Sequence, residues 1–355
     1  MLILQKIFEN YVAELKSAYL GKKTSFAYIK NSLPATSLIK DNEKFQVITI
    51  GGSILKSALI EKTSSGEKIL SMEKMRLPFF HEKKILLNFI EENIKSDIKT
   101  LSINFAYAIK PIFENGRPDE ILLYGDKEHA FDGLVGHKIG KTIEDYFREE
   151  HKREIKVSVA NDSVCLLLSG LGGHNLQELS AGIVGTGVNF AIFSDKNTII
   201  NLESGNFSKF SPSPITLEID TASQEKGKYL FEKEVAGGYL YKHFNILIKQ
   251  KNINYPPISS TEHLSKLAQE YLGEVSDLAK ELLVHSAQFA ACAIAGITKF
   301  KGHNMTFVMQ GSLFWEGYKY KETVENTVKE LIPEHEIKFV RIENAGILGA
   351  IKLLG

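Results

Sequence analysis

The stretch AGIVGTGVN, residues 181–189, joins two apolar runs through the turn Gly185-Thr186-Gly187. Glycine lets backbone N–H groups approach a phosphate because it has no Cβ, and a neighbouring hydroxyl adds a further donor. Hairpin turns also use glycine, to obtain the backbone twist that they need. Taken alone, the pattern therefore favours a turn over a phosphate site, and both interpretations stay open.

A second glycine turn lies nearer the start of the chain. The apolar run FQVITI (45–50) ends at Gly51-Gly52-Ser53, and ILKSALI (54–60) follows, which predicts a hairpin. This turn has the same two interpretations as the first. The chain has no G-x-x-x-x-G-K-[ST] motif, so the sequence excludes a P-loop NTPase.

Apolar and helical patterns alternate along the rest of the chain. Further strands are predicted within 98–109, 155–162, 179–193, 197–207, 305–314 and 337–342. Helices are predicted over 1–20, 133–152, 163–171, 227–249, 262–300, 320–331 and 345–355. Polar loops are expected at 31–34 and 114–120. The alternation predicts an α/β protein with mixed sheets, and the length of 355 residues allows two domains or two joined lobes.

Composition excludes several other classes of protein. Lys+Arg and Asp+Glu both number 43, so the balanced charge argues against a nucleic-acid binder. Cys165 and Cys292 lie in apolar runs and are expected to be buried core residues in a reducing cytosol. The helical pattern at the start contains Lys6, Glu9 and Glu14, which argues against a signal peptide. No apolar run reaches the length of about 18 residues that a membrane span needs.

Two acidic positions are candidates for catalysis or ligand binding. Asn161-Asp162 closes an apolar strand, and ligand sites of α/β proteins gather at such strand ends. Asp162 could instead cap the helix that follows, a role that Asp performs well, and taken alone the pattern favours the cap. Glu203 follows another apolar strand and could be a solvated turn carboxylate. The residues alone leave these alternatives open.

The order of these segments resembles the hexokinase family. ITIGGS, VANDSV, AGIVGTGVN, INLESGNF and GKYLFEKEVAGGYL are similar, in this order, to family motifs, and VMQGSLF and ENAGILGA resemble its adenosine-side segments. The resemblance covers most of the chain from about Ser32. It implies a two-lobed actin-like ATPase (ribonuclease-H-like) fold with mixed five-stranded sheets flanked by helices. It also implies a small lobe of 46–160 plus 346–355, a large lobe of 1–45 plus 161–345, and sugar and ATP in the cleft between them.

The resemblance also implies a role for each matching position. Asp162 would be the general base, and Lys127 would lie beside the transferring phosphoryl group. The implied sugar-binding residues are Asn161, Asn189, Glu203, Glu232, Asn104 and Asp126. The implied ATP-binding residues are Gly51, Gly52, Ser53, Gly185, Thr186, Gly187, Gly311 and Ser312.

Several positions depart from the family pattern. Thr49 stands where the family has an acid that organises the water shell of Mg²⁺, and Ile54 and Lys56 replace the Asn and Arg that follow. On the sugar side, Ala106 stands at a sugar-contacting Ser, and Asp126, Ala108 and Ser204 also differ from the pattern. Asp126 and Lys127 have an alternative interpretation as solvated loop charges.

The resemblance therefore implies a cytoplasmic, glucokinase-like hexokinase that uses ATP and Mg²⁺. It would transfer the γ-phosphate to the 6-hydroxyl of a hexose such as glucose, as a monomer or homodimer without nucleic-acid or membrane partners. Because of Thr49, Ile54 and Ala106, the alternative is a catalytically weak or inactive sugar-binding or regulatory protein of the same fold. A kinase for an amino sugar or a ketose is a third possibility.

Overall fold

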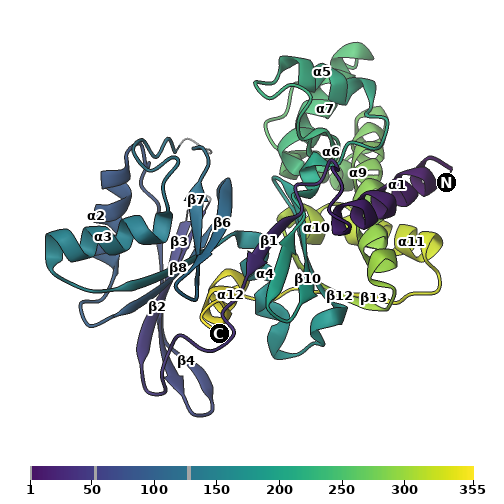
Figure 1. Cartoon of the computed structure of the whole chain (residues 1–355). Coiled ribbons are helices and arrows are strands. Elements are labelled where there is room, and N and C mark those ends of the chain that lie inside the picture. The colour runs from purple at the N-terminus through teal and green to yellow at the C-terminus, as the bar shows by residue number, and fades with distance from the viewer. Residues whose placement is uncertain (1, 52–53, 126–128) are drawn as a thin grey trace. The chain divides into compact units, whose positions relative to one another are not determined.

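The computed structural model of the chain describes residues 2–51, 54–125 and 129–355 (Figure 1). The chain folds into two compact units. Unit 1 contains residues 1–28, 177–191 and 201–341, and unit 2 contains residues 29–176, 192–200 and 342–355. The lobe boundaries implied by the sequence stay a prediction.

The main sheet of unit 2 has five strands in the order β4-β3-β2-β5-β8. Their bounds are β2 Lys44–Ile50, β3 Ile54–Thr63, β4 Gly66–Arg76, β5 Thr100–Phe105 and β8 Lys156–Ala160. The predicted hairpin is confirmed, because β2 and β3 pair antiparallel. The strands β2, β5 and β8 pair parallel, so their carboxyl ends lie at one edge of the sheet.

Helices cover both faces of this sheet (Figure 1). On one face, α2 (Lys83–Asn93) and α3 (Ile139–His151) pack their apolar sides on Ile48, Leu101 and Val157. On the other face, Ser102 donates a hydrogen bond of 2.7 Å to the backbone carbonyl of Ala350 in α12 (Ala345–Lys352). The helix α4 (Asp162–Ser169) packs against α12.

The segment 114–120 is not the loop that its composition predicts. It joins β6 (Ile109–Glu114) to β7 (Arg117–Leu122) in a tight antiparallel hairpin. Asn115 and Gly116 have φ values of 52° and 75°, as a two-residue hairpin turn requires, and Asn-Gly is the preferred pair for this geometry. The turn residues Asn115 and Gly116 and the nearby Pro118 favoured a loop prediction, so the strand β7 was not predicted.

The second sheet has six strands in the order β1-β11-β10-β9-β12-β13. The bounds are β1 Ile29–Ser32, β9 Leu179–Val184, β10 Val188–Asp195, β11 Thr198–Asn201, β12 Met305–Gln310 and β13 Ile337–Val340. The prediction of five strands is wrong for this sheet, because β1 includes the polar residues Asn31 and Ser32 that were expected in a loop. An edge strand takes its backbone hydrogen bonds from its neighbour, so polar residues can form it. Here Ser32 is exposed, and the buried Asn31 donates from Nδ2 to the carbonyl of Ile29 at 3.0 Å.

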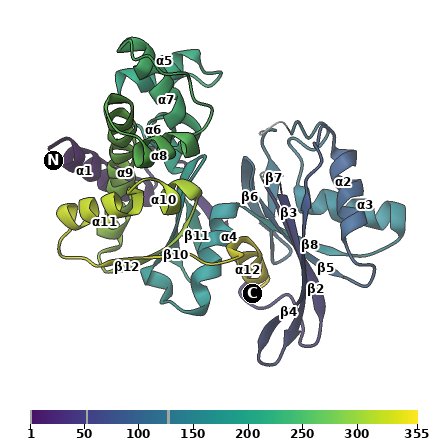
Figure 2. The same cartoon turned by 180° about the vertical axis from the view of Figure 1, so that it is seen from behind.

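Unit 1 is rich in helices. They are α1 Leu2–Tyr19, α5 Pro214–Ala222, α6 Leu230–Val235, α7 Gly237–Gln250, α8 Thr261–Glu270, α9 Glu274–Lys301, α10 Ser312–Glu316 and α11 Tyr320–Leu331. Figures 1 and 2 both show α1 beside α9. By length and composition, α9 is the one helix of the described chain that could cross a membrane, but 78% of its most apolar window is buried in the fold.

Two predicted helices have different limits. The helix expected over 133–152 begins at Ile139, because Gly133 and Gly136 have the positive φ values of turn residues. The helix expected over 227–249 is divided at Ala236, whose backbone is extended. The N–H groups of Gly237 and Gly238 bind carbonyl groups of another segment, which ends α6 and starts α7 in a new direction.

Candidate functional site

Polar side chains meet at the carboxyl ends of the parallel strands of unit 2. The sheet register places Thr49 of β2 beside Asn104 of β5, and Asn104 beside Ala160 of β8. Asn161 and Asp162 follow β8 directly. Because parallel strands bring residues from distant parts of the sequence to one edge, these four polar residues form a candidate ligand site.

Asp162 is the first residue of α4 and not its cap. The N-cap is Asn161, whose Oδ1 accepts hydrogen bonds from the backbone N–H of Ser163 at 3.0 Å and from the Ser163 hydroxyl at 2.6 Å. The alternative interpretation of Asp162 as the cap is therefore wrong. The half-buried Asp162 carboxylate sits at a helix N-terminus, where the helix dipole favours negative charge.

Capping also limits how Asn161 can bind a ligand. Its Oδ1 is occupied by Ser163, so the Nδ2 amide donor is the atom suited to a sugar hydroxyl oxygen. In the predicted contact, Asn161 would therefore donate a hydrogen bond from Nδ2 to the sugar and would not accept one through Oδ1.

Thr49 already has partners within the sheet. Its hydroxyl accepts a hydrogen bond of 3.2 Å from the backbone N–H of Lys56, and the Lys56 ammonium contacts Asn344 Oδ1 at 3.3 Å. Beside it, Asn104 is 7% exposed, and its Oδ1 has no hydrogen-bond partner in the described part of the chain. A Cβ on Gly346 would lie 2.7 Å from the Asn104 Nδ2, so α12 packs closely over this amide.

These residues fit a magnesium ion only if it arrives with its nucleotide. Within residues 2–51, 54–125 and 129–355, no group of three or more His, Cys, Asp or Glu side chains could hold a metal ion. Mg²⁺ commonly keeps several waters and binds through one or two carboxylates and substrate phosphates. Asn104 Oδ1 is a buried acceptor without a partner among the described residues, and Asp162 is the carboxylate that follows the paired strand β8.

A second polar cluster lies in unit 1, at the ends of β10 and β11. Asn189 donates to Asn201 Oδ1 at 2.8 Å, and Asn201 donates to Glu203 Oε1 at 2.7 Å. Glu203 has a left-handed backbone with φ 52°, a conformation that few residues other than glycine adopt. Nearby, Glu232 Oε2 accepts from the Val188 N–H at 3.2 Å. The structure thus unites Asn189, Glu203 and Glu232, and adds Asn201.

Buried packing supports this cluster from below. The hydroxyl of Tyr11 in α1 donates to Ser204 Oγ at 3.1 Å, and the Ser204 N–H donates to Asn189 Oδ1 at 3.2 Å. Burial raises the pKa of Tyr11 far above its ordinary value, against the smaller lowering effect of the Ser204 bond, so it stays a neutral donor. Ser204, one of the positions that depart from the family pattern, provides this link to α1.

The turn Gly185-Thr186-Gly187 is held by the start of α7. The N–H of Gly237 donates to Gly185 O at 2.7 Å, and the N–H of Gly238 donates to Thr186 O at 3.0 Å. A Cβ on either α7 glycine would lie 2.8 Å from the carbonyl oxygen that it binds. The exposed Thr186 therefore sits on a turn that these two hydrogen bonds hold in place.

A cavity of about 650 Å³ opens beside this turn. It is lined by Gly185, Thr186, Ser312, Gly237, Gly238, Thr261 and further residues of α8 and α10. Gly311 closes the far side of the turn, with a φ of 118° and an ideal Cβ position only 2.1 Å from Val184 O. The volume suits a nucleoside, since ligand pockets commonly measure about 300–1,000 Å³.

The structure thus brings some predicted residues together and leaves others apart. Gly185, Thr186 and Ser312 line the cavity, and Gly311 abuts the same turn, whereas Gly187 lies by the Glu232 carboxylate at the sugar-side cluster. Gly51 belongs to unit 2 and packs against Ala106. Gly52, Ser53, Asp126 and Lys127 lie outside the described residues.

Sequence reasoning missed Asn201, Gly237, Gly238 and Thr261. Asn201 ends a buried strand two residues before Glu203, which is the kind of signal that identified Asp162. The pair Gly237-Gly238 inside a helical pattern could have indicated a close backbone approach. The two cysteines are free and buried, as predicted.

Comparison with known proteins places this architecture in a class. The structure resembles Schistosoma mansoni hexokinase complexed with glucose, with a TM-score of 0.79 and 18% identity, over 99% of this chain and 94% of that one. It also resembles a ROK hexokinase from Thermus thermophilus, with a TM-score of 0.60 and 14% identity, over 87% and 97% of the two chains. The fold is therefore the actin-like ATPase fold, with mixed sheets flanked by helices.

The sequence comparisons are more specific. A family model described as Hexokinase matches residues 259–353. Hexokinase-1 of Saccharomyces cerevisiae is 22% identical over 77% of this chain and 63% of its own length, and hexokinase-2 of Candida albicans is 21% identical over 92% and 82%. The family model, the curated relatives and the solved structures together support the hexokinase family for this chain.

The chain spans less than two thirds of the length of several curated relatives. It covers 63% of the yeast hexokinase-1 and 56% of a hexokinase-like 1 protein of Arabidopsis thaliana, which is 24% identical over 66% of this chain. The activity and substrates of these relatives are therefore only proposed for this chain, in the next subsection.

Proposed function

We propose that this chain is an ATP-dependent hexokinase that transfers the γ-phosphate of ATP to the 6-hydroxyl of a hexose. The observation that carries the proposal is the position of Asp162. It follows a parallel strand at the edge where Thr49 and Asn104 also lie, and the N-cap of α4 is Asn161 and not Asp162. A half-buried carboxylate at such a strand end can act as a general base for a substrate hydroxyl.

The proposed reaction uses the two polar clusters in different ways. Asn189, Glu203 and Glu232 hold the sugar, because amide and carboxylate oxygens can each bind two neighbouring hydroxyl groups. Asp162 accepts the proton of the 6-hydroxyl as its oxygen attacks the γ-phosphorus in line with the leaving oxygen of ADP. Mg²⁺ bound with ATP would neutralise phosphate charge.

The nucleotide is proposed to lie in unit 1. Its nucleoside would occupy the cavity of about 650 Å³, and the turn of Gly185, Thr186 and Gly187 would hold phosphates. The α7 hydrogen bonds fix this turn before ATP binds, so little ordering is needed during the reaction. Lys127 would neutralise charge on the transferring phosphoryl group. We also propose that the chain acts in the cytoplasm.

An ADP-release assay with a panel of sugars tests this function. Glucose, mannose, fructose and glucosamine are each mixed with the chain and Mg-ATP, beside 6-deoxyglucose, which has no 6-hydroxyl. We expect ADP release with at least one hexose and none above background with 6-deoxyglucose. If no sugar gives turnover but one raises the melting temperature, the chain is a sugar-binding protein and the kinase proposal fails.

Replacing Glu203 by Gln tests the sugar-side cluster. The substitution keeps the shape but removes the charge that Asn201 and a sugar hydroxyl would bind. Hydrogen bonds to charged groups contribute about 1.5–3 kcal/mol, so the KM for hexose should rise roughly 10–150-fold. Steady-state kinetics measure the change. Glu330→Gln on the exposed face of α11 is the control and should change nothing. An unchanged KM in Glu203→Gln would remove Glu203 from the sugar site.

Replacing Gly311 by Ala tests the nucleotide side. The added Cβ meets Val184 O at 2.1 Å, and the φ of 118° is strained for alanine, so the turn after β12 must shift away from β9. A displacement of about 1 Å can cost on the order of 10²-fold in rate, and here the loss should appear in kcat/KM for ATP. Gly172→Ala is the control, because a Cβ there meets nothing within 4 Å. Equal kcat/KM for ATP in both variants would contradict the assignment.

A further inference from the structure

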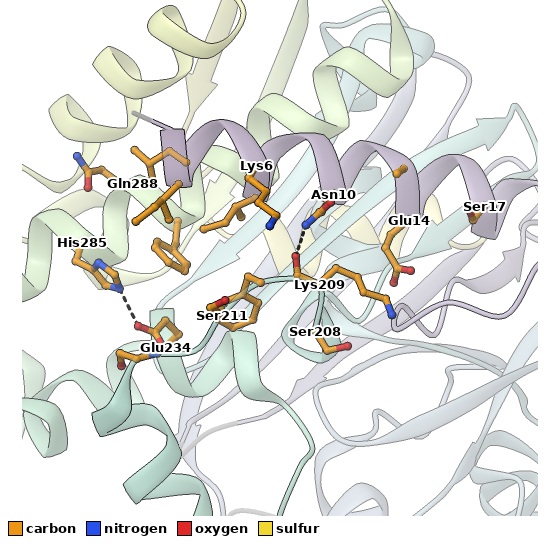
Figure 3. Close-up of a pocket in the computed structure, with 17 residues that line it drawn as sticks. Lys6, Asn10, Glu14, Ser17, Ser208, Lys209, Ser211, Glu234, His285 and Gln288 are labelled. Atoms are coloured by element: carbon orange, nitrogen blue, oxygen red, sulfur yellow. Dashed lines mark hydrogen bonds and ion pairs between the residues drawn. The ribbon is translucent and has the colours of Figure 1, made fainter.

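A larger cavity, of about 1,100 Å³, lies in unit 1 apart from every residue assigned above (Figure 3). It is lined by one side of α1, by the segment 208–213 and by residues 285, 288 and 289 of α9. None of the residues proposed to bind sugar, ATP or metal lines it. The proposed kinase reaction therefore gives this cavity no role.

One wall of the cavity is apolar. Leu4 and Ile7 of α1 and Phe289 of α9 line it, and each of them is less than 10% exposed. Phe210 stands edge-on to Phe289, with ring centroids 5.7 Å apart. This wall suits a hydrocarbon or aromatic body, because apolar surface that leaves water there meets apolar side chains.

The carboxylates of the cavity are already paired with protein donors. Glu234 accepts from His285 Nε2 at 2.7 Å and from the Ser213 N–H at 2.9 Å. Glu14 accepts from the Ser25 N–H at 2.6 Å and from the Ser25 hydroxyl. Although burial favours the neutral acid, the bonds to Glu234, led by His285, keep its pKa below the ordinary value, so it stays charged and occupied.

The two lysines that line the cavity, Lys6 and Lys209, differ from its carboxylates because their charged groups are not paired with protein groups in the described residues. Figure 3 shows Lys6 reaching from α1 toward the segment that carries Lys209 and Ser211. Within the described residues, the ammonium groups of Lys6 and Lys209 form no hydrogen bond or ion pair, and Asn10 binds the backbone carbonyl of Lys209 and not its side chain. Two exposed ammonium groups beside an apolar wall can therefore bind the acidic group of a ligand whose apolar part lies on that wall.

We propose that this cavity binds an amphipathic organic anion, with its apolar body against Leu4, Ile7 and Phe289 and its acidic group at Lys6 and Lys209. The volume exceeds that of common drug-sized pockets, so a medium-length acyl carboxylate or an aromatic sulfonate fits it. A cationic ligand of the same shape is disfavoured, because both carboxylates are engaged.

The fluorescent anion 8-anilinonaphthalene-1-sulfonate serves as the probe, titrated into the intact chain in excess ATP. Under the proposed function ATP fills the nucleotide cavity, so saturable enhancement in its presence reports the second cavity. We expect one equivalent of bound probe, displaced by octanoate and not by octylamine. No saturable binding, or displacement by both compounds alike, would overturn the proposal. Probe binding that ATP abolishes would assign the signal to the nucleotide cavity and overturn it too.

Matched variants locate the probe. Lys6→Met combined with Lys209→Met should weaken its affinity at least tenfold, and Lys16→Met, on an exposed face of α1 outside the cavity, should leave it unchanged. Ser211→Trp at the exposed rim should block entry, and Ala13→Trp is a second blocking variant if the first does not fold. Each variant is checked by circular dichroism. Unchanged affinity in the double-lysine variant, or in a folded blocking variant, would refute the site.

Discussion

Asp162→Asn is expected to lower hexose-dependent ADP release by roughly 10²–10⁴-fold, the usual contribution of a positioned general base. The amide keeps the shape and can still accept the 2.8 Å hydrogen bond that Asp162 Oδ1 takes from Ser163 N–H, so α4 should stay folded. It cannot take the proton of the 6-hydroxyl. Sugar binding, read from the melting-temperature shift with hexose, should be largely retained.

The control for this prediction is Asp41→Asn, at an exposed turn of unit 2. It makes the same chemical change without touching the site and should keep full turnover. Near-normal turnover in Asp162→Asn would remove Asp162 from the role of base. Loss of the sugar-induced shift together with turnover would instead indicate a binding role.

Lys233→Met is expected to destabilise unit 1 by about 3–5 kcal/mol. The substitution leaves the largely buried Asp220 carboxylate without its cationic partner. The Lys233 side chain is 2% exposed, and its ammonium contacts Asp220 at 2.6 Å. The same ammonium donates to Ser223 Oγ, Glu225 O and Lys228 O, and so orders the segment that leads into α6. Because Glu232 is the neighbouring residue, hexose affinity should also fall.

Urea denaturation followed by the fluorescence of Trp315 measures this loss, since the single tryptophan lies in unit 1. Lys228→Met is the control, because its ion pair with Glu225 is exposed. It should change stability by less than about 0.5 kcal/mol. Lys233→Met/Asp220→Leu, which removes both charges, should recover part of the stability. Equal stabilities of Lys233→Met and wild type would contradict the account.

The pH dependence of this effect has a definite sign. The Lys233 hydrogen bond holds the pKa of Asp220 below its ordinary value of 3.8. A depressed pKa in the folded state stabilises the protein above the unfolded pKa, and this contribution is lost as pH falls through the folded value. The difference between wild type and Lys233→Met should therefore be full at pH 7 and shrink below about pH 4.

Much of the fold could be predicted from local patterns. The helices α1 and α11 and the strands β2, β5 and β8 follow from periodicity and apolar runs. The polar strand β1 could not be predicted, because it gains its hydrogen bonds from a strand more than 160 residues further along the sequence. The break at Ala236 depends in the same way on carbonyl groups of the distant turn at Gly185.

The candidate site shows the same division. Asp162 was identifiable as a strand-end carboxylate, but its sequence neighbours could not decide between a cap and a base. The structure shows that the N-cap of α4 is Asn161 and not Asp162. Asn104 gained its place beside Thr49 from parallel pairing of β2 and β5, which no local signal specifies. Tyr11 reaches Ser204 across 193 positions of the sequence.

Identification of the product tests the central claim most directly. The chain is incubated with Mg-ATP and the hexose that gives the fastest ADP release, and the products are analysed by mass spectrometry and ³¹P NMR. The account predicts a hexose monophosphate with phosphate on the 6-hydroxyl, formed by wild type and nearly absent with Asp162→Asn. Inorganic phosphate as the sole phosphate product, or an equal yield of hexose 6-phosphate from both proteins, would contradict it.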